Sequence, residues 1–170
     1  MEINFKESGD DARSESDILS ALRESKLFAE LELPALLAIS ARAEILEFEA
    51  GHLIITEGME SDDVYLILRG QTAVQVESIN PPMEIGIARL GAGEIVGEIA
   101  LLSNAPRSAS VVAMQHVQLA RFNSDDLLEI FQNQPTWGMI FMRNLAAILA
   151  NRLKHMNRRV LNMTRSQFFS

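Results

Sequence analysis

The spacing of apolar residues changes twice along the 170-residue chain. Residues 17–42 place apolar side chains three or four positions apart, which indicates helices, and Pro34 is suited to begin a second helix. From 43 to 123 the apolar residues instead form short runs separated by turn residues. After Asn123 the helical spacing returns, and Pro135 marks the start of a long final helix. The pattern predicts a β-rich middle with helices on both sides.

Seven short runs rich in Ile, Val and Leu predict the strands of the middle region. Glycine or the sequence Asn-Pro-Pro follows most of them, so a turn falls roughly every 8 to 12 residues. Strands of this length and spacing favour an antiparallel sandwich or barrel. The runs are EILEF, HLIIT, VYLILR, TAVQVE, EIGIARL, SASVVA and VQLARF.

The final helix carries an apolar seam at alternating intervals of four and three residues, the a and d positions of heptads. The seam consists of Met142, Ala146, Leu149, Leu153, Met156, Val160 and Met163. One interpretation is that this stripe packs against the domain of its own chain. The polar flanks and the strict heptad spacing favour a second helix instead, and we expect a homodimer.

Composition excludes several classes of site. Hydrophobic residues make up 48% of the chain and the mean hydropathy is +0.08, as in globular proteins. There is no cysteine, and His52, His116 and His155 lie far apart, so we expect no metal centre. Residues 1–16 are acidic and lack the apolar core of a signal peptide, and no apolar run is long enough to span a membrane. We expect a flexible tail and a cytoplasmic protein.

Charge is distributed unevenly along the chain. The net charge is −8, yet residues 1–135 carry nine basic and 23 acidic side chains. From Thr136 onward there is no acidic residue, and six residues are basic: Arg143, Arg152, Lys154, Arg158, Arg159 and Arg165. This basic segment indicates either an anionic partner or simply a solvated helix face beside an acidic body.

The stretch GEIVGEIALLSNAPRSASVVA places two charges among small and aliphatic residues. Arg107 is a planar donor that can hold two phosphate oxygens, and Glu98 is an acceptor suited to a sugar hydroxyl. Gly97 allows close approach of the backbone, and Ser108 and Ala109 leave room beside the guanidinium. A turn of helix over EIALL would add N–H groups facing an anion. Alternatively, the two charged residues pair with one another, or Arg107 lies on a loop surface.

The same stretch closely resembles the phosphate-binding cassette of the cyclic nucleotide-binding domain family. The likeness extends over roughly residues 17–163, since DDVYLILRG and AEILEFEAGHLIITEGMESDD resemble the family's early strands and turns. The resemblance implies an antiparallel, jelly-roll-like β-roll with N-terminal helices and a long C-terminal helix. It places the binding domain at residues 17–134, and a dimerisation and lid helix with its tail at 135–170.

The resemblance also implies roles for the cassette residues. Glu98 would accept a hydrogen bond from the ribose 2′-hydroxyl, and Arg107 would hold the cyclic phosphate. The backbone N–H groups of Ile99 and Ala100 would complete the phosphate cradle. Ser108 would add its hydroxyl to the phosphate or to the base.

In the last helix, ANRLKHMNRRVLNM is similar to the dimerisation helix of the catabolite activator family. The similarity implies that Met156 and Asn157 lie at base-reading positions, and that Arg152 braces Glu98. The family carries hydroxyl residues where this chain has Met156 and Asn157, so base recognition differs here. We expect cAMP as the ligand, with cGMP the alternative because Ser108 could read guanine.

These observations predict a receptor that binds a cyclic nucleotide and signals through its C-terminal helix to a partner protein or a further domain. No helix-turn-helix follows the long helix in this sequence, so we expect no DNA binding by this chain alone. No acid–base pair or activated nucleophile is evident, and we expect no enzymatic activity. The alternatives are a ligand-free dimeric scaffold of the same fold and a cGMP-selective sensor.

Overall fold

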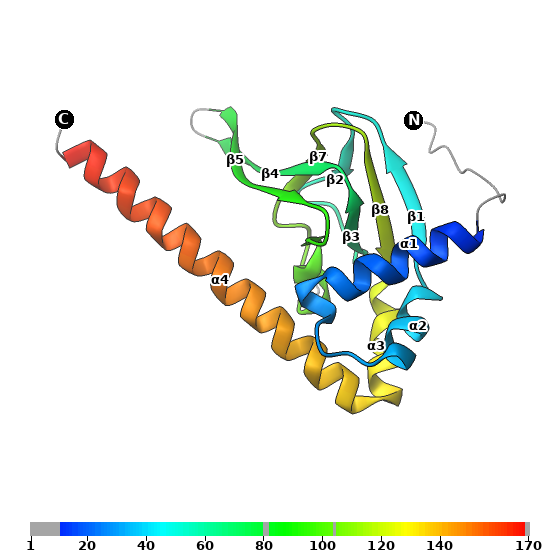
Figure 1. Ribbon diagram of the computed structural model, residues 1–170. Coiled ribbons are helices and arrows are strands. Elements are labelled where there is room, and N and C mark those ends of the chain that lie inside the picture. Colours follow the sequence, from blue (N-terminus) through cyan, green and yellow to red (C-terminus); the bar gives the residue numbers. More distant parts are fainter. Residues whose placement is uncertain (1–10, 80–81, 104, 169–170) are drawn as a thin grey trace.

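The computed structural model of the chain describes residues 11–79, 82–103 and 105–168. Within these residues, eight strands form two four-stranded sheets, and every pairing of strands is antiparallel. The strand orders are β1-β8-β3-β6 and β2-β7-β4-β5. Helices pack along one side of this roll (Figure 1). The predicted fold, an antiparallel roll with flanking helices, is confirmed.

Each of the seven predicted runs corresponds to one strand of the structure. The strands are β1 (Glu44–Phe48), β2 (Leu53–Ile55), β3 (Val64–Arg69), β4 (Gln71–Ile79), β5 (Pro82–Gly91), β6 (Ile95–Val96), β7 (Ser110–Ala113) and β8 (Val117–Phe122). Only β6 was not predicted. Two residues are too few to show an alternating pattern, and β6 exists because it pairs with Tyr65 and Leu66 of β3.

The central strands of the first sheet are buried on both faces. In β3, Val64 and Leu66 belong to a core shared with the helices, whereas Tyr65 and Ile67 face the interior of the roll. Strand β8 divides in the same way, as successive side chains of a strand point to opposite faces. This explains why the sequence VYLILR is almost continuously apolar.

The helices are α1 (Asp11–Glu24), the 3-10 helix η1 (Lys26–Phe28), α2 (Leu33–Ser40), the 3-10 helix η2 (Glu98–Leu101), α3 (Ser124–Asn133) and α4 (Pro135–Phe168). Pro34 lies in the first turn of α2 and Pro135 begins α4, as predicted. The expected tail over residues 1–16 needs correction, because α1 already begins at Asp11. Acidic residues such as Asp11 suit the first turn of a helix, although they carry no apolar signal. Residues 1–10 lie outside the described residues.

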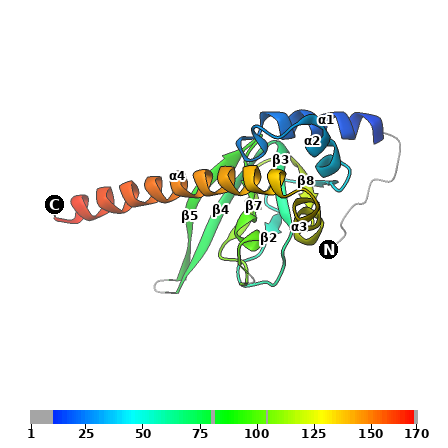
Figure 2. The same ribbon diagram turned by 90° about the horizontal axis from the view of Figure 1, so that it is seen from below.

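Helix α4 is a single helix of 34 residues whose far end extends away from the roll (Figures 1 and 2). Its first part is anchored: Phe141 and Leu145 are 0% and 1% exposed, and they pack in the core formed by the helices and the first sheet. Close packing against α3 depends on Gly138, where an added Cβ would lie 2.9 Å from Cβ of Phe131.

The predicted apolar seam of α4 divides into two parts. Met142 and Leu149 pack partly buried against the core of their own chain, while Ala146 is exposed. Farther along, Leu153 and Met156 are 59% and 48% exposed. The side chains of the last two seam positions, Val160 and Met163, lie outside the described residues. A homodimer through this seam stays a prediction.

Candidate functional site

Residues 93–113, called the cassette below after the family segment that they resemble, change direction sharply at Gly97, between β6 and η2. This glycine has φ of 79°, and a Cβ at its position would lie 2.8 Å from the carbonyl oxygen of Asp63 and 2.9 Å from Nη1 of Arg107. Both the backbone conformation and the lack of space therefore require glycine. The turn places the next residue, Glu98, inside the roll, where it is 3% exposed.

The guanidinium of Arg107 is buried and held by oxygens that carry no formal charge. Its Nη2 donates hydrogen bonds to Oγ of Ser61 at 2.9 Å and to the carbonyl oxygen of Asp63 at 2.6 Å. Its Nη1 donates to the carbonyl oxygen of Gly97 at 3.2 Å. The residue is 8% exposed, and among the described residues Nε finds no hydrogen-bond partner. A fixed cation with an unused donor is thus built into the cassette.

The loop between β2 and β3 supports this arginine. The N–H of Arg107 donates to the carbonyl of Met59, and the N–H of Gly58 donates to the carbonyl of Arg107, both at 2.9 Å. Ser61 and Asp63 come from the same loop. Sequence reasoning missed both residues as supports, because a lone serine and a backbone carbonyl leave no recognisable signal in a sequence.

Glu98 is paired with an arginine of α4 rather than with Arg107. Nη1 of Arg152 donates to the Glu98 carboxylate, and Nη2 of the same guanidinium donates to the carbonyl oxygen of Ile95 at 2.8 Å. The expectation that Arg152 braces Glu98 is confirmed. A buried carboxylate needs such a partner, since an unpaired charge in the interior is strongly destabilising. Arg152 thereby connects α4 to the cassette.

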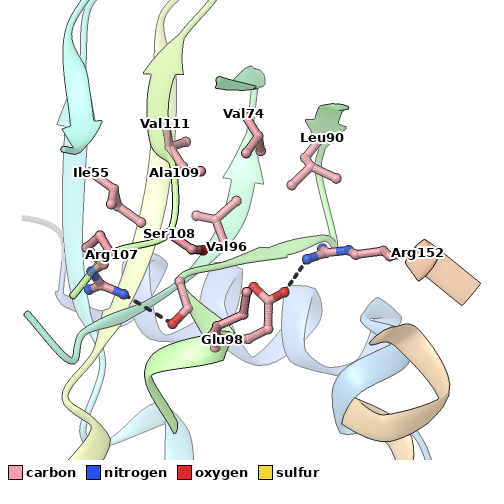
Figure 3. A pocket seen from close by; sticks show the side chains of 12 residues that line it. Ile55, Val74, Leu90, Val96, Glu98, Arg107, Ser108, Ala109, Val111 and Arg152 are labelled. Atoms are coloured by element: carbon pink, nitrogen blue, oxygen red, sulfur yellow. Dashed lines mark hydrogen bonds and ion pairs between the residues drawn. The ribbon is translucent and has the colours of Figure 1, made fainter. Parts of the chain in front are cut away.

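Glu98, Arg107 and Arg152 line one cavity of about 100 Å³ within the roll (Figure 3). The other lining residues are Ile55, Val74, Leu90, Val96, Gly97, Ile99, Ser108, Ala109 and Val111. The aliphatic side chains come mainly from strands, and the charged ones from η2, the segment after it, and α4. The cavity therefore has an apolar wall and a charged end.

The structure brings most of the predicted site residues together. The cavity lining includes six of them: Gly97, Glu98, Ile99, Arg107, Ser108 and Ala109. The seventh cassette residue, Ala100, lies in η2, and its side chain is outside the described set. Met156 and Asn157 are exposed on α4 about one turn beyond Arg152 and do not line the cavity. Their contact with a bound base stays a prediction.

Tyr65 lies close enough to Arg107 and Asp63 to interact with both electrostatically. Burial raises the pKa of the Tyr65 phenol above its ordinary value; the Asp63 carboxylate raises it further, and the Arg107 and Arg121 guanidiniums oppose this rise. The phenol is therefore neutral at physiological pH and adds no negative charge next to Arg107.

The described part of the chain holds neither a cluster of metal ligands nor a membrane-spanning helix. No group of three or more His, Cys, Asp or Glu side chains is placed to hold a metal ion there. Nor does any helix among those residues combine the length and apolar character needed to cross a membrane.

This chain is similar to part of Glutaminase 2 from Bradyrhizobium diazoefficiens. The two are 32% identical over 139 residues, which make up 82% of this chain and 21% of the glutaminase. The chain thus spans about a fifth of the length of that relative.

Solved structures share the fold at 25% identity or more. A cyclic nucleotide-binding domain from Methylobacillus flagellatus KT has a TM-score of 0.79 at 27% identity, covering 91% of this chain and 86% of its own. The catabolite activator protein of Thermus thermophilus scores 0.70 at 28% identity, with coverages of 82% and 63%. The regulatory domain of Toxoplasma gondii PKA with cAMP scores 0.65 at 26% identity, with coverages of 72% and 46%.

A family model described as the cyclic nucleotide-binding domain matches residues 45–134, slightly more than half of the chain. The matched segment contains the roll, the turn at Gly97 and the buried arginine. The chain belongs to the cyclic nucleotide-binding domain family.

Proposed function

We propose that this chain is a receptor domain that binds cAMP in the cavity of the roll lined by the cassette, the strands and Arg152 of α4. The observation that carries the proposal is the buried guanidinium of Arg107, whose Nε has no hydrogen-bond partner among the described residues. A buried donor without a partner costs about 1–3 kcal/mol, and a phosphate oxygen at this position would remove that cost. The solved regulatory domain that is similar to this chain contains cAMP, which supports the choice of nucleotide.

Arg107 and Glu98 would bind different parts of the sugar phosphate. The cyclic phosphate carries one negative charge, and Arg107 is already immobilised by three hydrogen bonds, so little side-chain entropy is lost on binding. The N–H groups of Ile99 and Ala100 in η2 would add donors to the phosphate. Glu98 would accept a hydrogen bond from the ribose 2′-hydroxyl.

Arg152 would make the position of α4 sensitive to the ligand. It holds one oxygen of the Glu98 carboxylate, the group proposed to bind the ribose. A ligand that shifts Glu98 therefore alters the environment of Arg152 and of the helix that carries it. Two sites coupled in this way influence each other reciprocally, typically by about 1–3 kcal/mol.

The distal part of α4 would provide the output. Its exposed apolar residues Leu153 and Met156 continue the heptad seam and suit a second copy of the helix. On the same part of the helix, Lys154 and Arg158 are exposed and could contact an acidic partner protein or a further domain. The domain would then act as a dimeric sensor and not as an enzyme.

The test is calorimetric titration of the purified chain with cAMP, alongside the variant Arg107→Ala. Loss of a charge-assisted contact in a partly dry pocket costs about 2–5 kcal/mol, so the dissociation constant should rise about 30-fold to several thousand-fold. Arg42→Ala is the matched control, because Arg42 lies in the turn after α2 and its guanidinium pairs with Asp126 and Glu129 of α3, away from the cavity lining. That variant should bind cAMP as the parent chain does.

Glu98→Gln should weaken binding less than Arg107→Ala, because the amide oxygen still accepts a hydrogen bond from the ribose hydroxyl. A thermal melt of each variant shows whether the fold is retained. Unchanged affinity in a folded Arg107→Ala variant would exclude this cavity as the phosphate site. Absence of cAMP binding by the parent chain would favour a scaffold role.

A further inference from the structure

The hydrogen-bonding side chains of the cavity are confined to one end. Glu98, Arg107, Ser108 and Arg152 come from the cassette and from α4. The wall formed by the strands consists of Ile55, Val74, Leu90, Val96 and Val111, none of which has a polar side-chain atom. Figure 3 shows Val74, Leu90 and Val111 on the strands away from Arg107, whereas Ile55 lies near that guanidinium. A nucleotide whose phosphate lies at Arg107 would place its base toward this wall.

At the centre of that wall the strand backbone is paired on both sides, at Val74 and Val111. Val74 of β4 pairs with Ala88 on one side and with Val111 on the other, and Val111 also pairs with Ile55. Thr72 carries a hydroxyl next to this wall, opposite Leu90, but it is 0% exposed and does not line the cavity. The aliphatic side chains of the wall therefore offer no donor or acceptor to the edge of a base, and the backbone at Val74 and Val111 is occupied by sheet pairing.

The polar residues of α4 are not placed to recognise the edge of the base either. Arg152 reaches the cavity, but its guanidinium is bound to the Glu98 carboxylate and to the carbonyl of Ile95. Asn157, the residue expected to contact adenine, is exposed and outside the cavity lining. In this arrangement the polar side chains that line the cavity come from the cassette and from α4, and none comes from the strand wall.

We propose that the site selects the ribose and the cyclic phosphate but is permissive for the purine base. The inference rests on the proposed function and specifies its ligand class. Apolar pockets discriminate weakly between bases of similar shape, whereas a site that hydrogen-bonds a group strongly rejects ligands that lack it. The chain should therefore bind cAMP and cGMP with dissociation constants within about fivefold of each other.

The experiment is a calorimetric titration of the full chain with four ligands. Cyclic AMP, cyclic GMP and cyclic IMP share a purine of similar shape but differ in the donors and acceptors on its edge. The fourth ligand, 2′-deoxy-cAMP, keeps the adenine and loses the hydroxyl proposed to bind Glu98. We expect the three purines to bind within about fivefold of one another. The deoxy ligand should bind about 10- to 100-fold more weakly than cAMP, as expected for a hydrogen bond to a charged group.

Two variants test whether a single side chain reads the base after all. Ser108→Ala removes the cavity's neutral polar side chain, and Asn157→Ala removes the amide on α4. In both variants the ratio of the cAMP and cGMP dissociation constants should stay within about twofold of the parent ratio. A shift of about tenfold in either variant would overturn the inference, since it would identify a base reader.

The remaining outcomes are also decisive. If cGMP binds more weakly than 2′-deoxy-cAMP, the base is selected more strongly than the sugar, and the inference is wrong while the proposed function stands. If none of the four ligands binds, the proposed function fails, and the inference fails with it. Equal binding of cAMP and its deoxy analogue would exclude the assigned role of Glu98.

Discussion

The two parts of α4 carry the same apolar repeat but lie in different surroundings. In residues 135–152 the helix is fixed by Phe141 and Leu145 in the core and by Arg152 at the cassette. From Leu153 onward, the described side chains up to residue 158 are exposed, as is Leu161. The seam therefore begins as a packing stripe of its own domain and continues as an uncovered surface. A periodic apolar stripe predicts burial, but it does not show whether the same chain or a second molecule covers it.

The two arginines of the site differ in a related way. Arg107 is held by Gly97, Ser61 and Asp63, all within the roll, and is almost fully buried. The side chain of Arg152 is 32% exposed and comes from a helix that extends beyond the roll. The first is a fixed part of the proposed site. The second is placed to report movement, because displacing α4 also displaces the partner of Glu98.

Substitutions in the two parts of α4 should differ most in their effect on the free energy of unfolding. Leu145→Ala leaves a cavity in the core and should lower the free energy of unfolding by about 3 kcal/mol. Leu153→Ala removes an exposed side chain and should change it by less than about 0.5 kcal/mol. Urea denaturation at low protein concentration, where sedimentation shows monomers, measures both values.

Pairing of α4 with a second copy would also make the stability of the parent chain depend on protein concentration. If α4 pairs with a second copy, the parent chain should gain stability with concentration, and Leu153→Ala should lose part of that gain. Equal destabilisation by the two variants at low concentration would show that the distal part of α4 is packed against its own chain after all.

Asn144 should give the next largest effect. Its Nδ2 donates to the carbonyl oxygens of Leu27 and Ala29, at 3.1 and 2.7 Å, and so ties α4 to η1. Asn144→Ala leaves both carbonyls without this donor and should lower the free energy of unfolding by about 1–3 kcal/mol. Asn151→Ala is the control, because that exposed residue lies farther along the same helix. It should be neutral or slightly stabilising, as alanine favours helices.

The fold could be predicted where prolines and glycines mark the ends of helices and strands. Pro34 and Pro135 mark helix starts, and a positive-φ glycine such as Gly70, between β3 and β4, ends a run at a turn. The two-residue β6 could not be predicted, because it depends on pairing with β3, far away in the sequence. The start of α1 at Asp11 was also missed, since its first turns carry charges rather than an apolar stripe.

The charged residues of the site could be predicted, but not their supports. Glu98 and Arg107 stand out because charges are unusual among small and aliphatic residues. Ser61 and the carbonyl oxygens of Ile95 and Asp63 become part of the site only through the fold. The apolar wall was not predicted either. A residue such as Val74 has the same appearance in a strand whether it faces a core or a ligand.

The smallest effect concerns the coupling of the two parts of α4 through the ligand. Leu153→Glu places a charge in the exposed seam and should separate a dimer that packs there. It lies next to Arg152, so loss of the second helix would leave α4 freer to move relative to Glu98. We expect cAMP affinity to fall several-fold, or about 1 kcal/mol, because coupling between dimerisation and binding is reciprocal.

Asn151→Glu is the control for this prediction, because it adds the same charge two residues earlier on the same helix, at a position outside the seam. Sedimentation and titration of both variants separate the effect of charge from the loss of the partner helix. Only Leu153→Glu should become monomeric and bind cAMP more weakly. A monomeric Leu153→Glu variant with parental affinity would show that the cassette and the anchored part of α4 bind the ligand unaided. The exposed part would then serve assembly alone, with Arg152 marking the boundary between the two roles.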